Sequence, residues 1–220
     1  MKYLILSKKQ WNKKNYNSLN KSFKFFSSIK INEIKKISPE IIFFIHWSKK
    51  IPSKIFNNYL CIQFHSSNLP KFKGGSPIQN QIINNKRKTK ITAFKVNETI
   101  DAGDFCLKKN LDLKGSANEI YIRMEKTCIN MIKKLTKKKR INFFKQKGKS
   151  TFYKRRKIEE SNISSLKSIN IKKIYNFIRM LDAPGYPNAF LEFKNFKIEI
   201  YDAKLKNKYL NAKIKILKKK

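Results

Sequence analysis

The chain has 220 residues, 40% of them hydrophobic, which suits one large domain or one domain with a small appendage. Its longest apolar run, 41–45, is far shorter than the ~20 residues of a membrane-spanning helix, and no signal-peptide pattern opens the chain. We therefore expect a soluble, cytoplasmic protein with no membrane partner. Three cysteines without CxxC spacing and two histidines predict neither disulfides nor a metal site.

The net charge is +38, from 52 Lys+Arg against 14 Asp+Glu. A charge of this size often marks a polyanion partner. Only six of the 52 cations are Arg, however, and the lysines are spread along the chain with many Ile and Asn, which AT-rich codons supply. Composition bias therefore explains the charge, and pure nucleic-acid binding is a minor alternative, because it would favour clustered Arg.

Short apolar runs in the first half of the chain predict buried strands. These runs are residues 3–6, 23–26, 41–45 and 60–64. Helical or irregular stretches separate them, at residues 9–20, 32–37 and 52–57. Repeated strand, crossover and strand predict an α/β fold with a Rossmann-like, mostly parallel sheet and helices on its faces.

Further elements follow a Gly/Pro loop at 69–77. We expect a helix at 77–84, a strand at 90–96 and a turn at 101–104. The longest predicted helix spans 116–136, and Ser116 with Glu119 forms a capping box at its start.

A basic, low-complexity stretch at 137–150 is predicted to link two domains. Residues 1–136 form the expected catalytic domain, and 151–220 a small α+β subdomain, an OB-like remnant. Within the subdomain we expect a helix at 171–181 and antiparallel strands at 189–193, 196–202 and 210–216. These strands are able to pair across a homodimer, although nothing in the sequence requires it.

One segment contains the candidate catalytic residues. The phosphate-binding, nucleophile-elbow and zinc-protease motifs GxxxxGK[ST], GxGxxG, GxSxG and HExxH are absent. The segment Gln63–Pro77 follows a predicted strand, and His65 falls at the carboxyl end of that strand, where open parallel sheets hold their active sites. Taken alone, His65 fits a hydrogen-bonded core histidine equally well.

Several ordered motifs accompany His65. They are Leu69-Pro70, Gly74, Pro77 and Asp101-Ala102-Gly103. With these residues the chain resembles the folate-dependent formyltransferase family over about residues 40–123. The family pattern is Asn-x-His, then a loop Ser-Leu-Leu-Pro-x-x-x-Gly-x-x-Pro and a later Asp-x-Gly. Gln63 departs from it, since it occupies the position of the family's Asn.

The resemblance implies formyl transfer from 10-formyltetrahydrofolate, the co-substrate, to a primary amine, with no metal. Attack by the amine creates an oxyanion and a cationic nitrogen, so the reaction needs a donor and a proton acceptor. His65 is the expected donor and Asp101 the expected proton acceptor. Gln63 is expected to supply an amide N–H to the oxyanion, with a smaller effect because its extra methylene displaces the amide. Substitution by the Asn68 amide is the alternative.

The resemblance also implies the binding residues. We expect the folate at the residues Phe44, His46, Trp47, Leu69, Val96, Asn97 and Asp101. The acceptor is expected at Asn68, Lys73, Gly75 and Pro77. A cation at Lys73 suits a substrate phosphate.

An amino-sugar nucleotide, used in surface-glycan biosynthesis, is the acceptor that we favour from the sequence. Only about 70 residues follow the linker, and segments 152–157 and 178–190 are similar to the C-terminal part of small sugar N-formyltransferases. One alternative is methionyl-tRNA, with the positive charge attracting its phosphates. Another is an inactive binding module; the Gln63 change supports it, whereas intact His65 and Asp101 argue against it.

Overall fold

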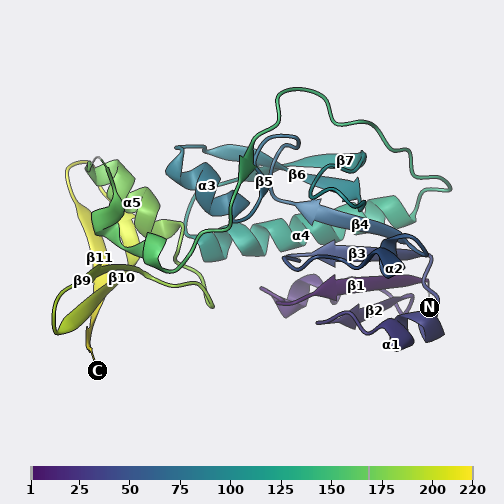
Figure 1. The fold of residues 1–220 in the computed structure, drawn as a ribbon, viewed down its shortest axis with the longest axis horizontal. Helices are drawn as coiled ribbons and strands as arrows, with labels where there is room; N and C mark the ends of the chain where they lie inside the picture. Colours follow the sequence, from purple (N-terminus) through teal and green to yellow (C-terminus); the bar gives the residue numbers. More distant parts are fainter. Residues whose placement is uncertain (1, 168, 220) are drawn as a thin grey trace.

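A computed structural model describes residues 2–167 and 169–219. Residue 1, where the first predicted domain begins, and residue 220, where the second ends, lie outside the described residues. Its centre is a six-stranded sheet in the order β2-β1-β3-β4-β6-β7 (Figure 1). The strands are β1 Tyr3–Ser7, β2 Phe23–Phe26, β3 Ile41–Ile45, β4 Leu60–His65, β6 Lys88–Lys95 and β7 Phe105–Asp112. The first four are parallel, which confirms the predicted Rossmann-like fold.

Alternate residues of the central strands fill two separate cores, one on each face of the sheet. In β3, for example, Phe43 and Ile45 enter one core, whereas Ile42 and Phe44 enter the other. Every residue of β3 is buried, as expected of a parallel strand covered on both faces. The carboxyl ends of β3 and β4 therefore meet at one edge, between the two cores.

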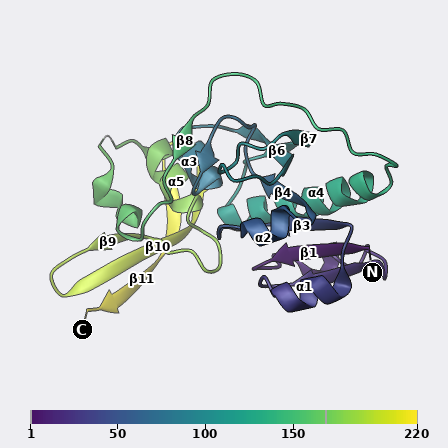
Figure 2. The same ribbon diagram turned by 45° about the vertical axis from the view of Figure 1, so that its right-hand side comes forward.

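Helices cover both faces of this sheet (Figures 1 and 2). They are α1 Ile31–Ile37, α2 Ser53–Phe56, α3 Pro77–Ile83 and α4 Ala117–Thr136. The α4 helix begins with the predicted capping box, in which the Ser116 hydroxyl accepts from the Glu119 N–H and the Glu119 carboxylate accepts from the Ser116 N–H. Residues 9–20 contain only one 3₁₀ turn, Lys13–Asn15, and are otherwise irregular.

One strand of the sheet was not predicted. β7 (Phe105–Asp112) pairs antiparallel with β6, which in turn pairs antiparallel with β4. The β7 segment FCLKKNLD has a polar centre and no clean alternation, because it is an edge strand. The sheet is thus mostly parallel with an antiparallel edge.

The segment after α4 runs back across the catalytic domain, arching over the sheet in both ribbon views (Figures 1 and 2). Phe144 pairs with Phe105 through two backbone hydrogen bonds. Farther on, β8 (Phe152–Tyr153) pairs in parallel with β5 (Lys73–Gly74) of the Gly/Pro loop. The domain division at 137–150 stays a prediction, although residues within 144–153 pair with the catalytic domain.

The C-terminal residues form a small lobe (Figure 1). It contains α5 Ile171–Arg179 and a three-stranded antiparallel sheet of β9 Ala189–Glu192, β10 Phe196–Leu205 and β11 Leu210–Lys218. This agrees with the predicted helix and three strands. Phe177 and Ile178 of α5 join the same core as α4, which packs the lobe on the catalytic domain. Within residues 2–167 and 169–219, no helix is long and apolar enough to cross a membrane.

Candidate active site

A cavity of about 830 Å³ lies at the carboxyl ends of β3 and β4. Two walls come from opposite faces of the sheet. Trp47, Ile51 and Val96 belong to one core, and Tyr121 and Met124 of α4 to the other. The cavity thus occupies the position where open parallel sheets place their ligands.

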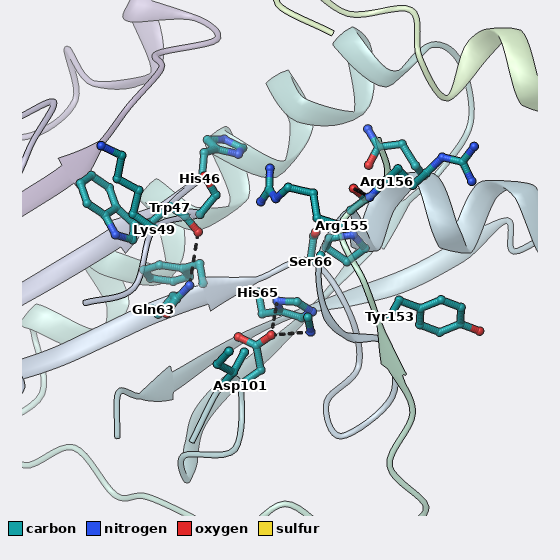
Figure 3. Close-up of a pocket in the computed structure, with 18 of the residues that line it drawn as sticks. His46, Trp47, Lys49, Gln63, His65, Ser66, Asp101, Tyr153, Arg155 and Arg156 are labelled. Atoms are coloured by element: carbon teal, nitrogen blue, oxygen red, sulfur yellow. Dashed lines mark hydrogen bonds and ion pairs between the residues drawn. The ribbon is translucent and has the colours of Figure 1, made fainter. Parts of the chain in front are cut away.

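His65 and Asp101 meet in this cavity (Figure 3). His65 Nδ1 lies 3.4 Å from Asp101 Oδ2, and each side chain is only 6% exposed. His65 Nε2 lies 2.7 Å from the Phe72 carbonyl oxygen, which only accepts, so Nε2 donates. The Phe72 carbonyl therefore fixes the ring with Nδ1 toward the carboxylate.

Backbone contacts hold Asp101 in place. The Gly74 N–H donates to Asp101 Oδ2 at 2.8 Å, and the Gln146 side-chain amide donates to the carbonyls of Asp101 and Gly103 at 2.9 and 2.8 Å. Asp101 has a left-handed backbone with φ of 53°. A Cβ at position 103 would lie 1.7 Å from the Lys95 carbonyl oxygen, so only glycine fits in this turn.

Gln63 lies on β4, two residues before His65, and therefore on the same face of the strand. Its side-chain amide donates to the Trp47 carbonyl at 3.4 Å (Figure 3). The amide N–H thus faces the end of β3, and it donates to Trp47 and not to His65.

His46 directly follows β3 and has a left-handed backbone, with φ of 50°. Its ring packs edge-on against Trp11 and Tyr121, with centroids 5.9 and 5.6 Å away. Burial, with a smaller effect of the nearby Lys9 cation, lowers the pKa of His46 to about 3, so the ring is neutral at pH 7.

The structure brings most of the predicted site residues together around the cavity. Those lining it are Gln63, His65, Asp101, His46, Trp47, Val96, Asn97, Gly75 and Pro77. Four predicted residues are not among those that line it. Phe44 and Leu69 are buried in the core, Asn68 lines a smaller neighbouring cavity, and Lys73 belongs to β5 beside the site.

Other lining residues were not predicted as site residues. Lys9 and Trp11 come from the loop after β1, Tyr121 from α4, and Tyr186 from the C-terminal lobe. Arg155 lies in the segment 152–157, which the sequence analysis compared with sugar N-formyltransferases. Its side chain reaches over the cavity between His46 and His65, whereas Tyr153 points away (Figure 3).

The lining of the cavity is strongly basic. It includes Lys9, Lys49, Lys50, Lys154, Arg155, Arg156 and Lys157, against the carboxylates Glu98 and Asp101. None of the ion pairs among the described residues involves Arg155. Such a surface attracts anionic ligands. No group of three or more His, Cys, Asp or Glu side chains suited to a metal ion occurs in the described parts of the chain.

Comparison with known proteins identifies the family. The "Formyl transferase" family profile matches residues 8–131. The chain belongs to the formyl transferase family. A second profile, "Methionyl-tRNA formyltransferase, C-terminal domain", matches residues 158–217. The resemblance on which the sequence analysis relied is therefore confirmed, as is the class of enzyme that it implied, a transferase.

Individual relatives give the same result. A methionyl-tRNA formyltransferase of Fusobacterium nucleatum is 30% identical over 189 residues, which cover 82% of this chain and 60% of that protein. The solved structure of methionyl-tRNA formyltransferase from Clostridium thermocellum is 39% identical, with a TM-score of 0.90 and 100% of both chains covered. The chain thus spans about 60% of the length of the curated relatives that it matches.

More distant structures share the fold alone. HypX from Aquifex aeolicus, solved in complex with tetrahydrofolic acid, is 15% identical with a TM-score of 0.73, over 92% of this chain and 38% of that one. A sugar N-formyltransferase from Shewanella is 18% identical with a TM-score of 0.66, over 88% of this chain and 93% of that one.

Proposed function

We propose that this formyltransferase moves the formyl group of 10-formyltetrahydrofolate to the amino group of methionyl-tRNA, in the cytoplasm. One observation carries the reaction class: a buried His65–Asp101 pair lies in the cavity at the strand ends, on the positions of the family motif. The acceptor is supported by the match of residues 158–217 to a methionyl-tRNA formyltransferase C-terminal domain.

The amino-sugar nucleotide that we favoured from the sequence is therefore the second candidate. Length does not separate the two acceptors, because the chain covers 93% of the Shewanella sugar N-formyltransferase and 100% of the Clostridium thermocellum methionyl-tRNA formyltransferase chain. The basic cavity suits either acceptor, since a sugar nucleotide and the end of a tRNA both carry phosphates.

In the proposed reaction, the neutral acceptor amine attacks the formyl carbon, a C–N bond forms, and the formyl oxygen becomes an oxyanion. A protonated His65 stabilises this negative charge from beside the formyl group. Asp101 accepts a proton from the amine nitrogen, and the bond from the formyl carbon to the folate nitrogen then breaks. Tetrahydrofolate leaves after its nitrogen regains a proton.

The folate binds, in this proposal, against the Trp47 and Val96 wall, where residues after β3 and before Asp101 line the cavity. The Lys49 and Lys50 cations at this end suit the carboxylates of a folate tail. The acceptor then approaches from the opposite wall, beside Trp11, Tyr121 and Arg155.

The test is release of tetrahydrofolate by purified protein supplied with methionyl initiator tRNA or with a panel of amino-sugar nucleotides. We expect turnover with the tRNA. Turnover with a sugar nucleotide alone would replace the acceptor and keep the reaction. Folate binding without turnover on any acceptor would favour the inactive module.

A further inference from the structure

Glu125 of α4 is a fully buried carboxylate, 0% exposed. It accepts four hydrogen bonds, all from the loop after β1. The Trp11 N–H and the Tyr16 hydroxyl donate to Oε2, each at 2.9 Å. The Asn12 N–H and the Asn15 side-chain amide donate to Oε1, at 2.8 and 3.0 Å.

Buried charges in proteins are ordinarily paired with an opposite charge. Among residues 2–167 and 169–219, Glu125 has no cationic partner, and four neutral donors satisfy it instead. Burial and the nearby Glu125 charge raise the pKa of Tyr16, which keeps that hydroxyl a donor. A carboxylate bonded in this way fixes the loop in one conformation.

The same helix also holds the side chain of Trp11. Tyr121 is four residues before Glu125 and so lies on the same helix face. Its ring stacks on Trp11, with centroids 4.4 Å apart and planes inclined by 14°. Thus α4 fixes the Trp11 backbone through Glu125 and the Trp11 ring through Tyr121.

Trp11 connects this helix to the C-terminal lobe across the cavity wall. Tyr186 stacks on Tyr121 at 5.5 Å, and their hydroxyls lie 2.7 Å apart. Lys9 Nζ lies 4.1 Å from the Trp11 ring centroid and donates to the Pro184 carbonyl. Lys9, Trp11, Tyr121 and Tyr186 thus form a continuous wall of the cavity, opposite Trp47 and Val96.

We infer that Glu125 is a positioning residue for the acceptor: it holds Trp11 and Lys9 in the wall along which the acceptor reaches His65 and Asp101. It does not face the folate wall, which belongs to the other core. This inference rests on the proposed formyl transfer, because the acceptor KM is its principal readout.

The test compares Glu125→Gln with Asn15→Ala. Gln places an NH₂ group where a carboxylate oxygen accepts two N–H or O–H donors, so the loop loses bonds. Asn15→Ala removes one of the four bonds and leaves those to the Trp11 and Asn12 amides. We expect Glu125→Gln to raise the acceptor KM about tenfold, with the folate KM within about twofold of wild type. Asn15→Ala should leave both KM values near those of wild type.

A second readout reports the loop directly. Trp11 and Trp47 are the two tryptophans of the chain, so Trp47→Phe protein reports Trp11 fluorescence alone. Adding Glu125→Gln to it should change the Trp11 emission, whereas adding Asn15→Ala should not. If Glu125→Gln protein does not fold, Trp11→Leu removes the wall and leaves the Glu125 hydrogen bonds, and the same rise in acceptor KM is expected.

Three results would overturn the inference: an unchanged acceptor KM, equal rises in the acceptor and folate KM values, or unchanged Trp11 emission. A wild-type protein that transfers no formyl group would overturn the proposed function as well. The two failures can therefore be told apart. If only the inference about Glu125 is wrong, the wild-type protein still transfers the formyl group.

Discussion

His65 Nδ1 and Asp101 Oδ2 lie 3.4 Å apart, and each of the two side chains also forms a hydrogen bond with the backbone. Nε2 donates to the Phe72 carbonyl, and Oδ2 accepts from the Gly74 N–H. Because Nε2 carries the proton that it donates to the Phe72 carbonyl, Nδ1 is the ring nitrogen that faces the carboxylate. In the proposed reaction, this pair holds and transfers a proton beside the cavity.

The first prediction concerns this pair. We expect His65→Ala and Asp101→Asn each to lower kcat by about 10²- to 10⁴-fold, because each removes a proton-handling group. Asn at 101 still accepts from Gly74, so the fold should survive. The measurement is tetrahydrofolate release, with Asp104→Asn as control, since Asp104 is an exposed neighbour outside the cavity lining. Equal losses in the Asp104 control would show that the loop, and not the carboxylate, matters.

The second prediction concerns Gln63. Its amide N–H donates to the Trp47 carbonyl, in a weak bond of 3.4 Å. Because the N–H is directed toward Trp47, its effect on the oxyanion should be small. We expect Gln63→Ala to lower kcat about tenfold, less than the ~10²-fold or more of a full oxyanion donor. Gln63→Asn, which restores the family residue, should equal or exceed wild type. A Gln63→Ala loss as large as that of His65→Ala would contradict this ranking.

The third prediction concerns Gln146, which lies in the segment after α4. Its amide donates to the carbonyls of Asp101 and Gly103, so Gln146→Ala leaves two part-buried acceptors unpaired. We expect a cost of about 1–3 kcal/mol in unfolding free energy and a lower kcat, because the Asp101 turn loosens. Lys147→Ala, at an exposed neighbour, is the matched control for urea unfolding and turnover. Unchanged kcat in Gln146→Ala protein would separate this segment from catalysis.

The fourth prediction concerns pH. The folded-state pKa of His46, about 3, lies below its ordinary 6.5. Below pH 6.5 the unfolded chain binds a proton that the folded protein does not, so stability falls as the pH drops from 6.5 toward 3. Between pH 7 and pH 5 the loss is about 2 kcal/mol. His46→Phe should remove this part of the pH dependence in urea unfolding, and an unchanged slope would contradict it.

The sequence was sufficient for the parallel half of the sheet, because strands buried on both faces are continuous apolar runs. Ile41–Ile45 is such a run, and it is β3. The capping box at Ser116 was equally local and was found in the structure. β7 was missed because an edge strand needs no apolar run, and FCLKKNLD has none.

The sequence likewise predicted some residues of the site and missed others. His65 and Asp101 belong to a compact motif, and the structure brings them together. Trp11 is held by a hydrogen bond to Glu125, and Gln146 by one to Asp101. Each pair is more than 40 residues apart in the sequence, so no local sequence pattern predicts these contacts. Leu69 was taken from the motif as a ligand residue, but it lies in the core with its N–H donating to the Thr92 hydroxyl.

The proposed formyl transfer is tested most directly by formylation of methionyl initiator tRNA by purified protein with 10-formyltetrahydrofolate, run beside His65→Ala protein. We expect stoichiometric formyl-methionyl-tRNA and tetrahydrofolate from wild type, and at least about a 10²-fold slower reaction from the variant. Wild-type protein that binds folate and formylates neither methionyl-tRNA nor any amino-sugar nucleotide would contradict it, as would His65→Ala protein with full activity.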